Sequence, residues 1–344
     1  MHPRFASAVP TALAGASLAL AALLAPAPAN AAPVAAPGYT VSVFAKSPQG
    51  STRPDSIAVV GNRIWVGYGN GGDPTGANGA KSTLVEYSFA GKIVRTMTIV
   101  GHNDGMRLDP FTRQIWALQN EDGNSTLVVI DPVSSAREHY RFPPGHHGGG
   151  YDDVAFRNGI AYVSASNPTL DAAGRSHGPS LVSVTPLPDH AIAVTPVLGA
   201  APRAIDTATG QSETLNLTDP DSTILTPAGD LLMDSQGDGE LVRIAQASGQ
   251  VYVTHLLGGV QVDDTAYATA RHGFLLVSDK PGNVIYRINA ATWAPGTAYS
   301  AMSGVSGTQS IAGYVGQLDF GSGALVPIVS GLDAGAGMVF VPAP

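Results

Sequence analysis

The chain has 344 residues, of which 44% are hydrophobic and only 13% are charged, so it can bury a large core. Its formal net charge is -8, which argues against binding to a nucleic-acid backbone, because that needs clustered Lys and Arg. The sequence contains no cysteine, which excludes disulfides, thiolate metal ligands and cysteine nucleophiles.

Residues 1–31 have the pattern of a secretory signal peptide. Arg4 precedes the apolar stretch ASLALAALLA, and the small residues Ala29 and Ala31 suit cleavage before Ala32. No second long apolar segment follows in the sequence, so we predict no membrane span. We expect an exported protein, periplasmic or secreted, that folds as one domain over residues 38–344 and is monomeric.

The rest of the sequence repeats a unit of short β-strands. Glycine and proline separate many runs of Val, Ile, Leu, Tyr and Thr, a pattern typical of an all-β protein. Five units begin with Asp, followed by an apolar strand, a turn and a second apolar strand. Their spacings of 49, 49, 68 and 43 residues are close to the roughly 40 to 50 residues of a propeller blade, with an insertion near GAAPRAIDTATGQ in the longest. The five units begin at Asp55, Asp104, Asp153, Asp221 and Asp264.

Most units continue with two further runs, which makes four strands per unit. The runs that remain lie at the two ends of the sequence: YTVSVFAK near the start, and NVIYRINAATW, AMSGVSGTQS, YVGQLDFGSGALVPIVSG and GMVFVPAP after the fifth unit. We predict that they form a sixth blade, built from both ends of the chain, which leaves no free sheet edge. The predicted fold is therefore an all-β, six-bladed β-propeller with four-stranded blades, and five or seven blades are the alternatives. We expect Trp65, Trp116 and Tyr162, which share one place in the second strands, to pack between blades.

The aspartates at the heads of the units are the main candidate site. Inner strands of a propeller run in one direction, so their heads share one mouth of the central channel. Carboxylates around a narrow opening repel one another by about a kcal/mol per close pair, and a divalent cation relieves this repulsion. Oxygen ligands suit Ca²⁺ first and also Mg²⁺ or Mn²⁺, while nearby histidines leave Zn²⁺ open. The alternative is that each Asp only caps a turn. The ring comprises Asp55, Asp104, Asp153 or Asp152, Asp221 or Asp219, and Asp264 or Asp263.

Three histidines approach the same mouth. His102 lies just before the second unit, and His146 and His147 lie on the stretch that leads into the third. A neutral imidazole is a suitable proton acceptor. Two adjacent histidines in an extended chain point to opposite sides, so at most one of the pair reaches a metal, and both could be solvated loop residues.

Two unit heads resemble a known family. GHNDGMRLDPFTRQIWALQ and DPDSTILTPAGDLLMDSQ are similar to the strand heads NDG and PDG of the senescence-marker-protein/gluconolactonase family. That resemblance implies a six-bladed propeller with a divalent cation in the channel and hydrolysis of sugar lactones. It implies that Asp221 is a metal ligand and base, and that Asn103 contacts the substrate. Asp55 stands where the family has Glu, and Asp152 or Asp153 where it has Asn.

The predicted chemistry is metal-dependent hydrolysis of a lactone or ester, a small-molecule substrate. The cation would polarise the carbonyl and lower the pKa of a bound water, while a carboxylate or imidazole accepts the proton. The alternative is a secreted propeller that holds a cation and binds a ligand or protein partner without turnover. The predicted roles are catalysis for Asp221, Asp104 and His102, substrate binding for Asn103, His146 and His147, and metal binding for Asp55, Asp152, Asp153, Asp221 and Asp264.

Overall fold

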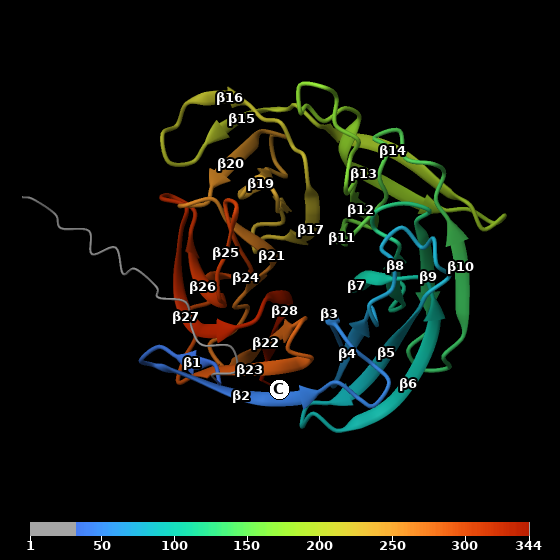
Figure 1. Cartoon of the computed structure of the whole chain (residues 1–344), viewed down its shortest axis with the longest axis vertical. Helices are drawn as coiled ribbons and strands as arrows, with labels where there is room; N and C mark the ends of the chain where they lie inside the picture. The colour runs from blue at the N-terminus through green and yellow to red at the C-terminus, as the bar shows by residue number, and fades with distance from the viewer. Residues whose placement is uncertain (1–31, 344) are drawn as a thin grey trace, which may run out of the picture.

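The computed structural model describes residues 32–343 as six twisted β-sheets arranged around a central axis (Figure 1). This confirms the predicted all-β, six-bladed propeller. The predicted signal peptide, residues 1–31, lies outside the described residues. No helix within residues 32–343 is long and apolar enough to cross a membrane.

Blades 1 to 3 each form from one continuous stretch of chain, as the repeat predicts. In each blade the first strand lines the channel and the fourth lies at the outside. From the inside outward they contain β3 (Pro54–Val60), β4 (Arg63–Tyr68), β5 (Lys81–Ser88) and β6 (Ile93–Val100); β7 (Asn103–Leu108), β8 (Ile115–Gln119), β9 (Thr126–Ile130) and β10 (Arg137–Arg141); and β11 (Val154–Arg157), β12 (Ile160–Ser164), β13 (Pro179–Pro186) and β14 (Ile192–Gly199).

Blade 4 contains the predicted insertion. Its four strands are extended at the outer edge by a hairpin, because the first strand of that hairpin pairs in parallel with the fourth strand of the blade. The blade strands are β17 (Pro220–Leu225), β18 (Leu231–Ser235), β19 (Glu240–Ile244) and β20 (Val251–His255), and the hairpin is β15 (Arg203–Asp206) and β16 (Ser212–Thr214).

Blades 5 and 6 exchange strands along the chain, and here the predicted unit beginning at Asp264 is wrong. Its two apolar strands do not pair with each other: the first belongs to blade 5 and the second to blade 6. The hairpin YVGQLDFGSGALVPIVSG and the Gly/Ser-rich run before it also belong to blade 5, not to blade 6. Blade 5 contains β21 (Val260–Tyr267), β24 (Ala298–Ser306), β26 (Gly313–Asp319), β27 (Ala324–Leu332) and β1 (Val34–Ala35), with β25 (Gln309–Ser310) beside β24.

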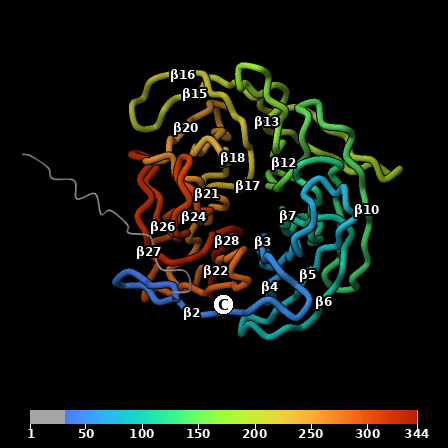
Figure 2. Tube along the Cα trace, in the orientation of Figure 1, coloured from blue at the N-terminus to red at the C-terminus, as the bar shows by residue number. Residues whose placement is uncertain are grey.

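Blade 6 closes the ring with strands from both ends of the described chain, as predicted. Its order from the inside is β28 (Gly335–Pro342), β22 (Gly273–Asp279), β23 (Val284–Ala290) and β2 (Tyr39–Lys46). Figure 2 shows the blue N-terminal strand lying beside the orange and red segments at this closure. β1 precedes residue 38, the predicted start of the domain, yet pairs with β27.

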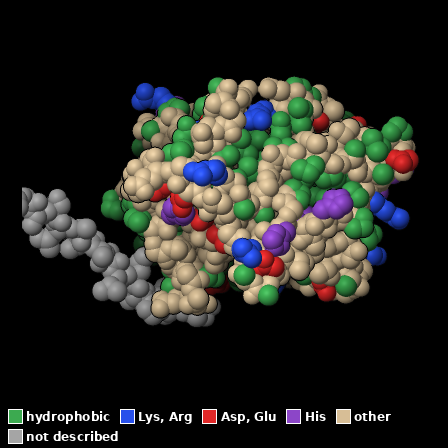
Figure 3. Space-filling model, turned by 90° about the horizontal axis from the view of Figure 1, so that it is seen from above, with side chains coloured by type: hydrophobic (Ala, Val, Ile, Leu, Met, Phe, Trp, Pro, Cys, Tyr) green, Lys and Arg blue, Asp and Glu red, His purple; other side chains and the backbone are tan. Residues whose placement is uncertain are grey.

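The hydrophobic core is divided into six clusters, each lying between two neighbouring blades. Trp65, Trp116 and Tyr162 are buried in three successive clusters, which confirms their predicted packing between blades. The core therefore surrounds the channel and leaves its polar lining to the inner strands. On the side shown in Figure 3, acidic and basic side chains lie interspersed among polar and hydrophobic ones.

Candidate functional site

A repeated β-bulge sets the position of the aspartates at the channel mouth. Between the pairs Pro54–Tyr68 and Ile57–Val66, β3 contains two residues and β4 contains only one. The same extra residue occurs in β7, β17, β21 and β28. Such bulges re-aim side chains and commonly lie beside functional sites. The first residues of these bulges are Asp55, Asp104, Asp221, Asp263 and Ala336, and the register of β11 places Asp152 at the equivalent position.

This register decides between the alternatives that the sequence left open. Asp152 and Asp263, rather than Asp153 and Asp264, correspond to Asp104. At two of the bulges, the second position is a glycine, Gly105 or Gly337, that lies against the backbone of the next inner strand. A Cβ on Gly105 would lie 2.3 Å from the carbonyl oxygen of Asp152, so only glycine fits there.

Asp104, Asp152 and Asp221 converge from blades 2, 3 and 4. One carboxylate oxygen from each lies within 4.8 Å of the others. Asp152 is buried, and its Oδ1 has no hydrogen-bond partner among the described residues. Burial, together with the charges of Asp221 and Asp104, raises the pKa of Asp152 well above its usual value. Burial also raises the pKa of Asp221. Carboxyl groups this close require a shared proton or a cation between them.

Lys280, just after β22, supplies a positive charge to this mouth. Its ammonium contacts Asp55 Oδ2 and lies 3.5 Å from Asp104 Oδ1. Burial alone would lower the pKa of Lys280, but the carboxylates of Asp55 and Asp104 outweigh it and raise that pKa, so the side chain stays charged. Burial would likewise raise the pKa of Asp104, yet Lys280 holds it below its usual range. The predicted metal ligand Asp55 is therefore engaged by an internal ammonium.

A second polar group shares Asp104. His102 Nε2 lies 3.4 Å from Glu121 Oε1 and 4.0 Å from Asp104 Oδ1. Burial lowers the pKa of His102, so its imidazole is neutral at pH 7. Burial and the charge of Asp104 raise the pKa of Glu121 to about 10, which keeps its carboxyl protonated. The predicted base His102 thus lies beside one ionised and one protonated carboxyl group.

Asp153 and Asp264 are brought together by an arginine instead of by the mouth trio. Arg107 NH2 lies 2.6 Å from Asp153 Oδ2 and 3.1 Å from Asp264 Oδ1. Backbone amides complete the network: Thr223 donates to Asp153 Oδ2 at 3.2 Å and Met338 donates to Asp264 Oδ2 at 2.8 Å. The carboxylate oxygens of Asp153 and Asp264 are thus occupied by Arg107 and by backbone amides. These contacts join inner strands of different blades in the channel wall, and they do not involve the trio.

The predicted substrate contacts lie apart from the trio. Asn103 is fully buried, and its Nδ2 donates to the Leu118 carbonyl at 2.8 Å. His146 is exposed. His147 is buried, with Nε2 2.8 Å from the Gly150 carbonyl oxygen and its ring edge-on to Tyr151. The contacts of His147 shape the stretch that leads into Asp152, and substrate binding by the three residues stays a prediction.

Sequence reasoning did not single out Lys280, Glu121 or Arg107. Lys280 and Glu121 follow second strands, in the loops SDKPGN and QNEDGNS, and in a propeller the loops between second and third strands open on the same mouth as the heads of the inner strands. That position was a signal for both residues. Arg107 lies inside a strand, and no pattern in the sequence shows that it faces two aspartates from other blades.

The acidic side chains at the mouth outnumber the one ammonium group described there, that of Lys280. Asp234 and Asp263 are further acidic groups near the trio, and burial raises the pKa of each. Neither carboxylate oxygen of Asp234 has a hydrogen-bond partner among the described residues. The donor set of the trio consists of carboxylate oxygens, which fit a hard divalent cation such as Ca²⁺, Mg²⁺ or Mn²⁺. The unpartnered Asp152 Oδ1 is consistent with a ligand at this position.

No protein-family model matches the chain, and no curated protein matches it. Several solved structures are similar. Streptogramin B lyase is 11% identical with a TM-score of 0.44, covering 80% of this chain and 72% of that chain. A protein of unknown function from Bacteroides caccae is 11% identical with a TM-score of 0.49, covering 84% and 86%. A protein provisionally named a gluconolactonase is 13% identical with a TM-score of 0.46, covering 87% and 83%. These similarities concern the fold alone.

Proposed function

We propose that this protein is a divalent-metal-dependent hydrolase that acts on a lactone or ester at the channel mouth. The observation that carries the proposal is the convergence of Asp104, Asp152 and Asp221, whose ligand oxygens lie within 4.8 Å of one another. These three residues would hold the metal, with Ca²⁺ the first choice because every donor is a carboxylate oxygen. When bound, the cation would polarise the substrate carbonyl and acidify a bound water.

His102 is the proposed general base. Its imidazole is neutral at pH 7, because burial lowers its pKa, so Nε2 can accept a proton. Asp104 Oδ1, 4.0 Å away, would stabilise the imidazolium that forms. Glu121, 3.4 Å from the same nitrogen, is protonated, so it places no second negative charge beside the imidazole.

Lys280 has a different role in the proposal. Its ammonium is held between Asp55 and Asp104, which fixes its position at the mouth. A fixed positive charge there stabilises the oxyanion that develops on an attacked carbonyl. The ammonium also limits the number of carboxylates that repel one another, so the mouth tolerates the trio before any metal binds.

The test is to measure metal content and hydrolysis of a panel of lactones and aryl esters, with and without EDTA. Asp152→Ala should lose the bound metal and the activity, because it removes one of the three oxygen ligands. His102→Gln should keep the metal and lower kcat by about a hundredfold with little change in KM, as expected for loss of a general base. Asp189→Asn, which changes an exposed turn residue of blade 3, is the matched control.

Two results would contradict the proposal. Unchanged metal content in Asp152→Ala would remove the assigned metal site. Absence of turnover by the metal-loaded protein on the whole panel would leave a cation-binding propeller that acts through a ligand or partner rather than by catalysis.

A further inference from the structure

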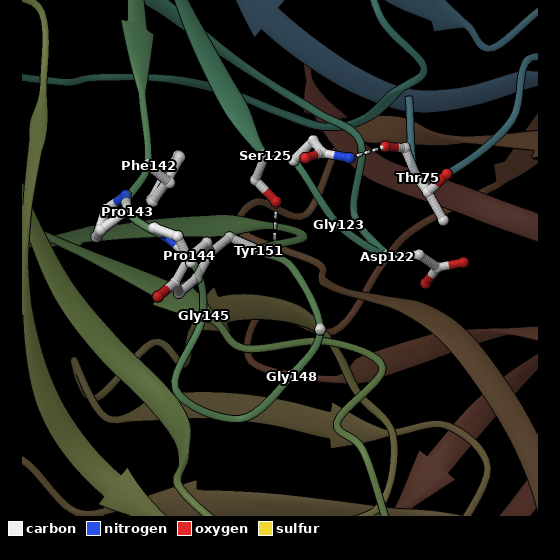
Figure 4. Close-up of a pocket in the computed structure, with 12 residues that line it drawn as sticks. Thr75, Asp122, Gly123, Ser125, Phe142, Pro143, Pro144, Gly145, Gly148 and Tyr151 are labelled. Atoms are coloured by element: carbon white, nitrogen blue, oxygen red, sulfur yellow. Dashed lines mark hydrogen bonds between the residues drawn. The ribbon is translucent and has the colours of Figure 1, made fainter. Parts of the chain in front are cut away.

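A cleft of about 530 Å³ opens beside the channel mouth, and no role described above uses it. It lies between the loops that join β4 to β5, β8 to β9, and β10 to β11 (Figure 4). The stretch that leads into Asp152, with Pro143, Pro144 and three glycines, forms one of its sides. The residues that line the cleft include Thr75, Asp122, Phe142, Pro143, Pro144 and Tyr151.

The two sides of the cleft differ in chemistry. Phe142, Pro143 and Pro144 lie on one side, whereas Thr75 and Asp122 lie on the other (Figure 4). The rings of Phe142 and Tyr151 are stacked, with centroids 4.4 Å apart and planes at 23°. An apolar wall of rings opposite a carboxylate suits a ligand that has an apolar body and a polar end.

The apolar wall is held in place by hydrogen bonds. Ser125 Oγ accepts a hydrogen bond from the Tyr151 amide at 2.9 Å and donates to the Asn120 carbonyl at 2.8 Å. Phe142 is tied to the same serine, since its amide donates to the Ser125 carbonyl at 3.2 Å. The aromatic pair therefore belongs to a wall that exists before a ligand arrives, which lowers the entropic cost of binding.

The charge of the cleft is negative. Asp122 has the one carboxyl group among the residues that line it. Burial, and then the charge of Asp104, raises the pKa of Asp122, which shows that the acidic mouth acts on this carboxyl group. An anionic ligand would be repelled by Asp122 and by the acidic mouth, and a cation would be attracted by them.

The cleft is also continuous with the mouth along the chain. Asp122 directly follows Glu121, which contacts His102, and Tyr151 directly precedes Asp152 of the trio. Two residues that line the cleft are therefore direct chain neighbours of Asp152 and Glu121.

We propose that this cleft binds an organic cation, an ammonium group carried on an apolar or aromatic body. The body packs against Phe142, Pro143 and Pro144, and the ammonium faces Asp122 on the other side of the cleft. Under the proposed function, on which this part rests, the cleft holds the portion of the substrate remote from the scissile bond. The preferred substrates are then esters or lactones that bear an ammonium group.

The test is calorimetric titration of the purified protein, EDTA-treated and calcium-loaded, with benzyltrimethylammonium, benzyl alcohol and benzoate. These compounds share a ring and differ in charge. We expect the cation to bind at least about tenfold more tightly than the alcohol, and benzoate not to bind. Asp122→Asn should remove this preference, and Asp189→Asn, with the same change in net charge, should keep it.

Binding of benzoate as tight as that of the cation would overturn the proposal, and so would an unchanged cation affinity in Asp122→Asn. If Asp122→Asn fails to fold, the three-compound series on the unaltered protein still decides. The measurement separates the two proposals. Cation binding without hydrolysis rejects only the hydrolase, and hydrolysis with no preference for cationic over neutral esters of equal leaving group rejects only the cleft assignment.

Discussion

Lys280 shows how one side chain changes the charge balance of a ring of carboxylates. An Asp at the head of a strand either caps a turn, binds a metal or pairs with a cation, and the sequence alone cannot choose. Here the ammonium contacts Asp55 and lies 3.5 Å from Asp104, so part of the ring is neutralised internally. Within residues 32–343, neither Asp152 nor Asp221 forms a salt bridge with an ammonium or guanidinium group, which concentrates the demand for an external cation at the trio.

Replacing Lys280 tests this division. Lys280→Met keeps the apolar stem and removes the charge, which leaves Asp55 and Asp104 without their ammonium. We expect the unfolding free energy at pH 7 without metal to fall by about 3 kcal/mol, as when one partner of a buried pair is removed. Urea denaturation measures it. The double variant with Asp55→Asn should recover part of the loss, and a loss below about 1 kcal/mol would show that the pair acts as a surface ion pair.

At the scale of elements, a β-bulge recurs in the inner strands and places an Asp side chain at the channel mouth. It needs one extra residue in the inner strand, and it explains why Asp152 rather than Asp153 joins the trio. A strand alternates its side chains, so a shift of one residue moves a carboxylate to a different neighbour. The shifted Asp153 and Asp264 meet Arg107 instead.

The hairpin of β15 and β16 is fastened to blade 4 by a second charged element. His255 on β20 has Nε2 2.8 Å from Glu213 of the hairpin and Nδ1 3.2 Å from Glu240 of β19, and Asp206 adds negative charge. Burial would lower the pKa of His255, but the two glutamates raise it above 6.5. Burial raises the pKa of Glu240 to about 7. Both shifts mean that the folded state holds more protons than the unfolded state.

This contact therefore stabilises the fold most at low pH. The part due to His255 is fully present below pH 6.5 and is lost as the pH rises through the higher folded pKa. The part due to Glu240 is lost between about pH 4.5 and pH 7. We expect the destabilisation caused by His255→Gln to be larger at pH 6 than at pH 8, measured by urea denaturation. Exposed His272→Gln is the control, and an equal effect of His255→Gln at both pH values would refute the assignment.

At the scale of the whole molecule, closure of the ring depends on β28. This strand pairs with β22 and packs between β21 and β3, so it completes both blade 6 and the channel wall. By contrast, β1 adds two residues to the outside of blade 5. A propeller without an inner strand exposes sheet edges and the core between two blades.

Two truncations compare these ends. A chain that stops at Asp333 lacks β28 and should show no cooperative thermal unfolding by circular dichroism, because blade 6 then has no inner strand. A chain that starts at Pro37 lacks β1 and should unfold cooperatively, with a midpoint only a few degrees lower. A cooperative transition in the first chain would show that the ring does not need β28 for closure.

The sequence by itself determined the all-β propeller class and the mouth where the acidic residues meet, and it favoured six blades over five or seven. Those follow from local pattern: alternating apolar residues, turns rich in Gly and Pro, and Asp repeated at one place in each unit. It could not determine that β21 and β22 lie in different blades, because each run is an equally good strand beside either partner.

Only the tertiary structure decided which carboxylates belong together. Asp104, Asp152 and Asp221 converge because equivalent positions in separate blades direct them toward one axis. Asp55 instead pairs with Lys280, and Asp153 and Asp264 pair with Arg107. Such partnerships join residues from different blades. They depend on distances of a few ångströms that the spacing of residues along the chain does not contain.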